Sequence, residues 1–222
     1  EPTNEPMSSK ISVYVVDDHP LMRKGLMLTI ESSIEFTVCG QAESAEIALR
    51  EIPSCKPDIA ILDISLPGMN GIELAKHLLA IEPDLRILMV SRHDEDLYAE
   101  RALKAGAKGY VMKMEAGDVI FSALRTIHQG QIYVSDSIRN KMLMKLTGHG
   151  GDTGNPLDTL SDRELEIFEL TGQGHSTREI SERLHISVKT VESHRANIKE
   201  KLQLKNATEL MRHAIRWLES NR

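Results

Sequence analysis

Cysteine and aromatic residues are scarce in this sequence, and long apolar runs are missing. Its 222 residues include 2 cysteines and 4% aromatic residues. Cys39 and Cys55 lack the spacing of metal ligands, which predicts ordinary thiols in a reducing cytosol. No apolar run approaches the roughly 18–20 residues that span a bilayer. Residues 1–6, EPTNEP, lack the basic start and the apolar stretch of a signal peptide, so we expect a cytoplasmic protein without a membrane partner.

A break in composition divides the sequence near residue 150. Residues 147–156 contain four glycines and one proline, which is typical of a flexible linker. Residues 159–222 carry 11 basic against 10 acidic side chains, whereas the rest of the chain carries 16 against 23. Within residues 185–216 the count is 7 against 3, which favours contact with a polyanion. We therefore expect domains at 10–130 and 159–222, joined by a linker at 131–158 with a possible short helix.

Short runs rich in Ile, Val and Leu alternate with helical patterns through the first domain. We place strands near 11–16, 36–41, 58–62, 86–91 and 109–112, and helices near 20–32, 44–53, 71–81, 95–105 and 116–129. Apolar runs of this kind are typical of parallel strands that are buried on both faces. The alternation predicts a flavodoxin-like α/β fold, with a doubly wound sheet of five parallel strands.

Polar side chains stand at the end of four of these strands. Asp17 and Asp18, Asp63, Ser91 and Lys113 each end or follow an apolar run. The carboxyl ends of parallel strands meet at the sheet edge where ligands bind, so we expect these side chains to converge. Three carboxylates so close together repel one another and require a cation. Oxygen ligands favour Mg²⁺, which also binds a phosphate.

The second domain is predicted to be all helical, with clear signals where its helices begin. Residues 161–164 (SDRE) and 176–179 (STRE) fit the capping box, residues 206–209 fit it more loosely, and Ser187 can cap a further helix. These signals predict four helices near 161–172, 176–184, 188–203 and 207–219. The second and third are short and joined by a tight turn, which is typical of a helix-turn-helix.

The third helix of this domain is the predicted DNA-reading element. Its inward stripe has the spacing i, i+7 and i+11, at Val191, Ile198 and Leu202. The basic side chains expected on phosphates or bases are Lys189, Arg195 and Lys199. If Glu192 faces the groove, it can accept from a cytosine amino group. The alternative is a helical interaction domain with a solvated basic face.

Each candidate residue also has a purely structural interpretation. Asp17 and Asp18 could cap a helix, Asp63 could be a turn residue, and Ser91 could cap the helix that follows it. Lys113 could be a surface lysine, Tyr110 could be core packing, and His194 could pack between helices. A small-molecule enzyme with a helical appendage is disfavoured, because no glycine-rich phosphate loop follows the first strand.

Several motifs together resemble a known family. Residues 15–20 (VVDDHP), 62–71 (LDISLPGMNG) and 104–113 (KAGAKGYVMK) resemble a response-regulator receiver domain. Residues 160–164 (LSDRE), 176–181 (STREIS) and 187–195 (SVKTVESHR) resemble the LuxR-type helix-turn-helix. A receiver followed by this output domain is the arrangement of the NarL/FixJ family of bacterial response regulators.

The resemblance implies a role for each residue of the first domain. Asp63 matches the phosphoacceptor, and Ser91, Tyr110 and Lys113 match the switch hydroxyl, the switch aromatic and the lysine that pairs with the phosphoryl group. Asp17, Asp18, Asp63 and the backbone carbonyl of Ser65 match the Mg²⁺ ligands. The domain would catalyse its own phosphotransfer and dephosphorylation and act on no metabolic substrate.

The resemblance also implies partners: a sensor histidine kinase, promoter DNA, and a second copy of the chain on that DNA. It places the DNA contacts on the third helix of the second domain, at Lys189, Thr190, Glu192, Ser193, His194, Arg195 and Lys199. A regulator that binds DNA without phosphorylation is the alternative within the same fold.

Two departures from the family pattern concern the phosphoryl site. Met114 follows Lys113 where many receivers have a proline, often with a cis bond, and we expect a trans bond here. The positions that the family links to phosphoryl lifetime are occupied by Ser65 and His93.

Overall fold

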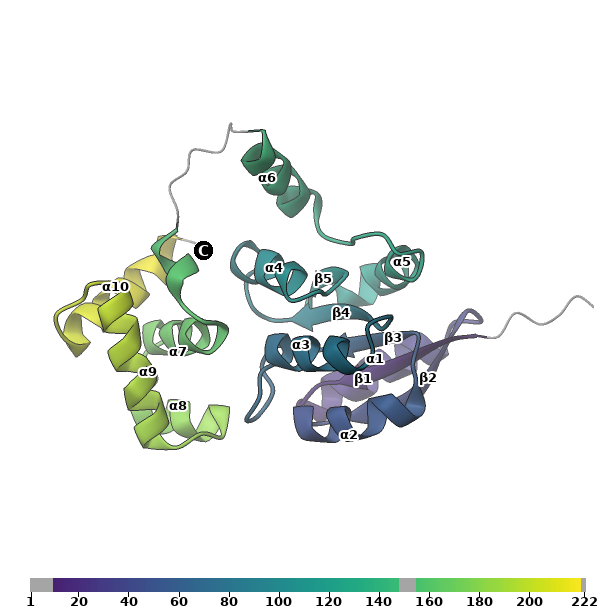
Figure 1. Ribbon diagram of the computed structural model, residues 1–222, viewed down its shortest axis with the longest axis horizontal. Helices are drawn as coiled ribbons and strands as arrows, with labels where there is room; N and C mark the ends of the chain where they lie inside the picture. The colour runs from purple at the N-terminus through teal and green to yellow at the C-terminus, as the bar shows by residue number, and fades with distance from the viewer. Residues whose placement is uncertain (1–9, 148–154, 221–222) are drawn as a thin grey trace, which may run out of the picture. The chain divides into compact units, whose positions relative to one another are not determined.

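The computed structural model describes residues 10–147 and 155–220. By its internal contacts the chain divides into two compact units, between Arg139 and Asn140 (Figure 1). Most of the predicted glycine-rich segment, residues 148–154, lies outside the described residues. The two units are described separately below.

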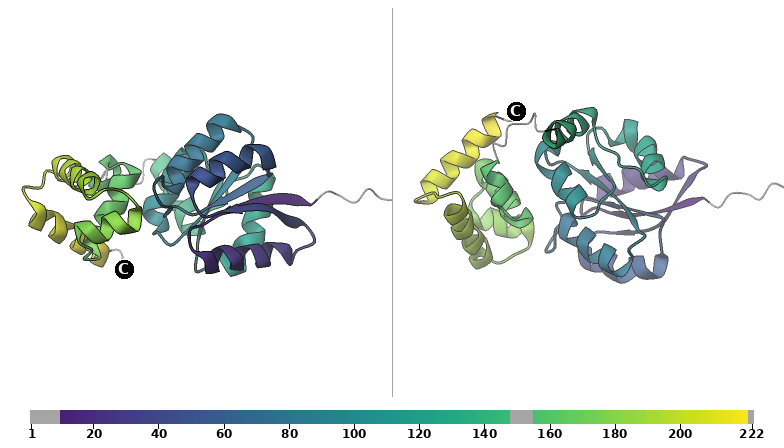
Figure 2. Two further views of the ribbon diagram at one scale, coloured as in Figure 1. Left: turned by 90° about the horizontal axis from the view of Figure 1, so that it is seen from below. Right: turned by 45° about the horizontal axis from the view of Figure 1, so that its top comes forward.

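The first unit is a parallel sheet with helices on both faces, and its strand order is β2-β1-β3-β4-β5 (Figure 1). The strands are β1 (Ile11–Val16), β2 (Phe36–Ala42), β3 (Ile59–Leu62), β4 (Arg86–Ser91) and β5 (Gly109–Met112). The helices are α1 (Pro20–Glu31), α2 (Ala45–Cys55), α3 (Gly71–Ile81), α4 (Glu95–Lys104), α5 (Ala116–His128) and α6 (Asp136–Leu146). Helices α1 and α5 cover one face, and α2, α3 and α4 cover the other (Figures 1 and 2).

Burial explains why the sheet has helices on both sides. All four residues of β3 are buried, so neither face of the central strand can be left to water. On one face, Leu26 of α1 and Ile120 and Leu124 of α5 join the strand residues in a single apolar core. Side-chain caps begin the helices that follow three of the strands: Ser44 accepts from Ile47 N, Asn70 from Glu73 N, and Asp94 from Asp96 N. The doubly wound five-stranded sheet is therefore confirmed.

The chain does not leave this unit directly after α5. The segment 130–135, which we call the return segment, comes back along the outer side of β5. Tyr133 forms a parallel bridge with Gly109, with hydrogen bonds of 2.9 Å from Tyr133 N to Lys108 O and from Tyr110 N to Tyr133 O. Ser135 Oγ then donates to Glu95 Oε1 of α4 at 2.8 Å. The return segment partly covers an edge strand whose backbone groups would otherwise be open to other chains.

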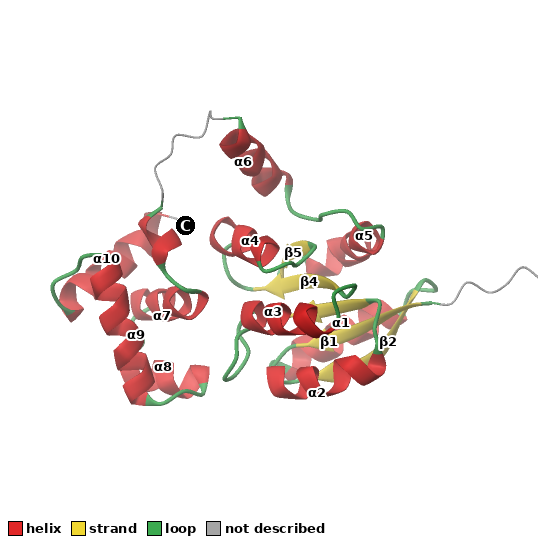
Figure 3. Cartoon of the chain, viewed as in Figure 1, coloured by secondary structure: helices red, strands yellow, loops and turns green. Residues whose placement is uncertain are grey.

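The described part of the second unit is helical and shows no strand (Figure 3). Its elements are a 3₁₀ turn (Pro156–Thr159), α7 (Asp162–Gly172), α8 (Thr177–Leu184), α9 (Val188–Lys201) and α10 (Ala207–Ser220). Both predicted capping boxes are present, at the starts of α7 and α8, and Ser187 caps α9. The all-helical second domain is thus confirmed. No helix among the described residues has the length and apolar character needed to cross a membrane.

Candidate functional site

Backbone pairing brings the polar strand ends of the first unit together. The ladder continues one residue past the strands, because Asp63 N donates to Val16 O at 2.9 Å and Lys113 N donates to Ser91 O at 2.7 Å. Gly71 allows α3 to begin against this edge. A Cβ atom there would lie 1.9 Å from the carbonyl oxygen of Asp63, so only glycine fits.

A buried lysine joins two of the carboxylates. Lys113 Nζ lies 2.6 Å from Asp17 Oδ2 and 2.6 Å from Asp63 Oδ2. The side chains of Asp17 and Asp63 are each 2% exposed and that of Lys113 is 7% exposed, so solvent screens these charges weakly. A buried charge is tolerated when it is paired, and here one ammonium pairs with two carboxylates.

The acidic cluster has the composition of a hard-cation site. Oxygens of Asp17, Asp18 and Asp63 and a ring nitrogen of His19 lie within 4.8 Å of one another. Asp18 Oδ1 is buried and accepts no hydrogen bond within the described residues, although it lies 2.6 Å from His19 Nδ1. A buried carboxylate oxygen without a donor is a suitable ligand for a divalent cation. The acidic pocket is therefore consistent with Mg²⁺.

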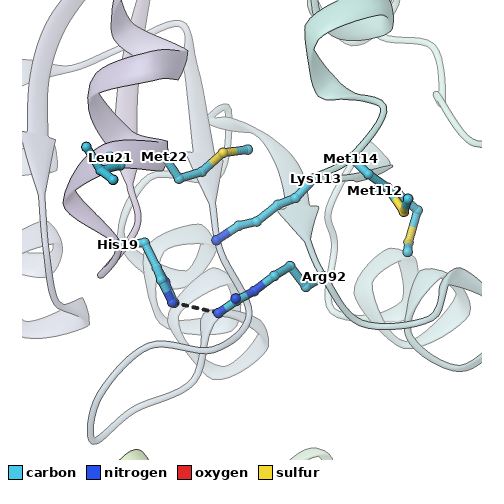
Figure 4. Close-up of a pocket in the computed structure, with 7 residues that line it drawn as sticks. All are labelled: His19, Leu21, Met22, Arg92, Met112, Lys113 and Met114. Atoms are coloured by element: carbon cyan, nitrogen blue, oxygen red, sulfur yellow. Dashed lines mark hydrogen bonds between the residues drawn. The ribbon is translucent and has the colours of Figure 1, made fainter.

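His19 and Arg92 meet beside this cluster. His19 N donates to Asp17 Oδ1 at 2.8 Å, which turns the chain into α1. On the other side of the ring, Nε2 lies 2.6 Å from Arg92 Nη2 (Figure 4). The imidazole thus connects the acidic pair after β1 to the loop after β4.

The residues after β4 form a second hydrogen-bonded group. Ser91 is fully buried, and its Oγ accepts from His93 N at 3.3 Å. The His93 ring is 2.7 Å from Ser65 Oγ, and its backbone carbonyl accepts from the Tyr110 hydroxyl at 2.7 Å. Tyr110 is 1% exposed, with its ring directed inward. The hydroxyl of Ser91, the ring of Tyr110 and the loop after Asp63 therefore meet through one residue, His93.

A pocket of about 560 Å³ opens beside Lys113 (Figure 4). It is lined by His19, Leu21, Met22, Arg92, Met112, Lys113 and Met114. Its rim is apolar and open to solvent, because Leu21 is 88% and Met114 86% exposed. The site is thus a charged centre flanked by apolar side chains from α1 and from the start of the loop after β5.

In the second unit, α8 and α9 form a helix-turn-helix. Helix α8 ends at His185, which has a left-handed φ of 53°, and Ser181 Oγ donates to Ile186 O at 2.6 Å across the turn. Val191 and Ile198 of α9 are fully buried, as the predicted inward stripe requires, and Leu202 at the end of that stripe is partly exposed.

The predicted DNA-contacting residues of α9 fall into two groups. Those that are exposed are Lys189, Thr190, Glu192 and Ser193. Those that are partly buried are His194, Arg195 and Lys199. The first group occupies the first two turns of α9, which are the part of a recognition helix that contacts base edges.

Arg195 is bound within its own unit. Its Nη1 donates to Thr177 Oγ1, at the start of α8, at 2.6 Å. Burial lowers the pKa of the Arg195 guanidinium below its ordinary value. In this structure Arg195 holds the two helices of the motif together.

Family comparisons cover both units. Residues 13–125 match the family model of the response regulator receiver domain, and residues 158–214 match that of bacterial regulatory proteins of the luxR family. The chain belongs to the response regulators.

Curated relatives align along the whole length of this response regulator. Oxygen regulatory protein NreC of Staphylococcus carnosus is 31% identical over 93% of this chain and 97% of that protein. Response regulator GacA of Pseudomonas aeruginosa is 34% identical over 93% and 96%. Transcriptional regulatory protein DegU of Brevibacillus brevis is 30% identical over 95% and 96%. The chain is accordingly a two-component transcriptional regulator, with a receiver followed by a LuxR-type DNA-binding domain.

Solved structures agree with this assignment. The response regulator ChrA of a heme-sensing two-component system is 29% identical, with a TM-score of 0.52 over 96% of this chain and 99% of that chain. A two-component response regulator of the LuxR family from Aurantimonas is 32% identical, with a TM-score of 0.58 over 63% of this chain and 99% of that chain. The RcsB response regulator of Salmonella typhimurium is 25% identical, with a TM-score of 0.57 over 93% and 98%.

The structure of the response regulator brings the sequence candidates of the receiver together. Asp17, Asp18, Asp63 and Lys113 form one charged cluster, with Ser91 and Tyr110 in the adjoining group. Sequence reasoning missed the contact between His19 and Arg92. Its signal was position alone, because each residue directly follows a predicted site residue, Asp18 or Ser91.

Proposed function

We propose that Asp63 accepts a phosphoryl group from a sensor histidine kinase and that the modified receiver promotes DNA binding by α9. The observation that supports this most strongly is the buried Lys113 ammonium held between Asp17 and Asp63. Such a cation has little use in a purely structural turn, but it can neutralise the charge that gathers on a transferring phosphoryl group.

In the transfer, a carboxylate oxygen of Asp63 forms the new O–P bond while the P–N bond to the kinase histidine breaks. Lys113, already 2.6 Å from Asp63 Oδ2, then pairs with the phosphoryl oxygens. Little covalent chemistry is asked of the receiver, because most of the catalysis lies in positioning and charge neutralisation. The same groups allow the receiver to catalyse its own dephosphorylation, and no metabolic substrate is involved.

Mg²⁺ is the metal proposed for the acidic pocket. Asp17, Asp18, Asp63 and the backbone carbonyl of Ser65 would hold it. When bound, it supplies positive charge to phosphoryl oxygens in place of water. Its binding also offsets the mutual repulsion of the carboxylates, of which Asp17 and Asp63 are almost fully buried.

The signal would leave the site through Ser91 and Tyr110. A phosphoryl group on Asp63 offers acceptor oxygens to the Ser91 hydroxyl, whose Oγ now accepts from His93 N. Moving Ser91 disturbs His93, to which the Tyr110 hydroxyl is bonded. Tyr110 is also bonded through its backbone to Tyr133 in the return segment, so the change reaches the linker.

The output is sequence-specific DNA binding by a homodimer. The residues proposed as DNA contacts are Lys189, Thr190, Glu192, Ser193, His194, Arg195 and Lys199. Exposure favours the first four as base readers. The receiver would occupy residues 10–130, the linker 131–158 and the DNA-binding domain 159–222, in a cytoplasmic protein.

A binding experiment tests this function directly. Genomic fragments from the source organism are selected by the full-length chain, and their affinity is measured with and without beryllofluoride and Mg²⁺. We expect beryllofluoride to tighten specific binding by at least about 10-fold, or 1.4 kcal/mol. The Asp63→Asn variant should show no such response. Equal affinity with and without beryllofluoride would favour a regulator that binds DNA independently of phosphorylation.

Substitutions in α9 should separate phosphate contacts from base readers. Lys199→Ala should weaken binding to specific and scrambled duplexes alike, and should lower the log–log salt slope by about 0.9. Lys189→Ala or Glu192→Ala should instead change which base is preferred, by roughly 1–3 kcal/mol.

The measurement is a salt titration of each variant against both duplexes, with the exposed Arg178→Ala in α8 as a control outside α9. If all three α9 variants stay within about 0.5 kcal/mol of the parent chain, α9 is not the recognition helix.

A further inference from the structure

A β-bulge on the edge strand of the receiver has a cysteine as its extra residue. The register between β1 and β2 passes from Val13 opposite Val38 to Tyr14 opposite Gly40, so Cys39 has no partner in the ladder. Bulges redirect side chains and are rare between parallel strands. Here the space beside the bulge is filled by the Tyr14 ring, because a Cβ atom on Gly40 would lie 2.4 Å from it.

The two cysteines of the chain meet at this bulge. Cys39 Sγ donates to Val13 O at 3.6 Å, and Cys55 Sγ, on the last residue of α2, donates to Cys39 O at 3.5 Å. Each thiol therefore serves a backbone carbonyl at the irregular point of the ladder. Cys39 is exposed and Cys55 is half-buried, so a small oxidant can reach the pair.

The two thiols also interact with each other. Partial burial, together with a hydrogen bond and a charge interaction with the Cys55 side chain, raises the pKa of the Cys39 thiol to about 12. Cys39 is thus held as a neutral thiol next to Cys55. Cysteine pairs in a reducing compartment stay reduced, and those that do oxidise are usually transient and redox-sensing.

We infer that Cys39 and Cys55 are a reversible modification site, which a peroxide converts to an intrachain disulfide. The Cys55 thiolate attacks the peroxide, its O–O bond breaks, and Cys55 becomes a sulfenic acid with release of water after proton uptake. The Cys39 sulfur then displaces the sulfenic oxygen, the S–S bond forms, and a second water leaves with the Cys39 proton. Two thiols are oxidised and one peroxide is reduced to two waters. The bond fastens the end of α2 to the edge strand, remote from Asp63.

The test treats the full-length chain with hydrogen peroxide and counts thiols with a maleimide after denaturation. The reduced chain should take two labels and the oxidised chain none, with an intact mass lower by about 2 Da and both thiols restored by a dithiol reductant. The Cys39→Ser variant, which lacks the second thiol, should retain a sulfenic acid on Cys55 that a dimedone probe traps. The matched Cys55→Ser variant should trap none.

Three outcomes would overturn the inference. The first is a peroxide-treated chain that still takes two labels. The second is a disulfide between two chains, visible as a dimer on a non-reducing gel, which would make Cys39 a surface thiol rather than half of a pair. The third is oxidation that the dithiol does not reverse, since that marks sulfinic acid in place of a disulfide.

Discussion

The response regulator with Asp63 replaced by asparagine should take up no phosphoryl group from acetyl phosphate. The amide is uncharged and is not a nucleophile, so the O–P bond cannot form. The fold should survive, because Lys113 keeps its second partner, Asp17, at 2.6 Å and no buried charge loses all pairing. Intact-mass measurement with Mg²⁺ present should show the parent chain gaining about 80 Da and the variant gaining nothing.

The control for this substitution is Asp84→Asn. Asp84 is an exposed aspartate in the turn before β4, at the opposite edge of the sheet. That variant should be labelled at the parent rate. A phosphorylated species appearing in Asp63→Asn at the parent rate would remove Asp63 as the acceptor, and peptide mapping of that species would identify the residue that replaces it.

The second large effect is expected at Asp18. Asp18→Ala should slow labelling by more than about 100-fold at a fixed Mg²⁺ concentration, because a proposed metal ligand is lost. Thermal stability should be unchanged or higher, since one of three crowded carboxylates has been removed. This combination of lost activity and retained stability distinguishes a functional carboxylate from a structural one.

A titration with Mg²⁺ gives this test its resolution. The labelling rate is measured across the titration for the parent chain, for Asp18→Ala and for Asp84→Ala as the matched exposed control. If Asp18→Ala is labelled like the parent at every Mg²⁺ concentration, the acidic pair serves only to start α1. In that event the variant should instead melt at a lower temperature, since a lost helix cap costs about 1 kcal/mol.

The secondary structure could be predicted closely where local signals are strong. Ser161 and Ser176, each followed three residues later by glutamate, begin α7 and α8 as expected, because a capping box is complete within four residues. The end of α2 was harder to predict. The sequence favours an end at Pro53, but the helix continues to Cys55, and Lys56 closes it with a left-handed φ of 48°. Proline is tolerated this close to the end, where few later hydrogen bonds depend on it.

The receiver site was predictable in its membership and unpredictable in its contacts. Strand ends with polar residues converge in any parallel sheet, so Asp17, Asp63 and Lys113 could be grouped from the sequence. The hydrogen bond between His19 and Arg92 depends on how two loops face each other across the edge, which no periodicity encodes. The trans bond expected at Lys113–Met114 is confirmed, since no peptide bond in the described residues is cis.

The return segment determines where the chain leaves the receiver. Helix α5 runs back along the sheet, so a chain that ended there would depart from the edge opposite Asp63. Residues 130–135 instead run parallel to β5 and return to the edge that bears Asp63 and Ser91. Ser135 is bonded there to Glu95, which is four residues after Ser91 in the sequence. The exit of the chain and its chemical site thus share one rim, and a displacement of the β4–α4 loop reaches the linker without crossing the sheet.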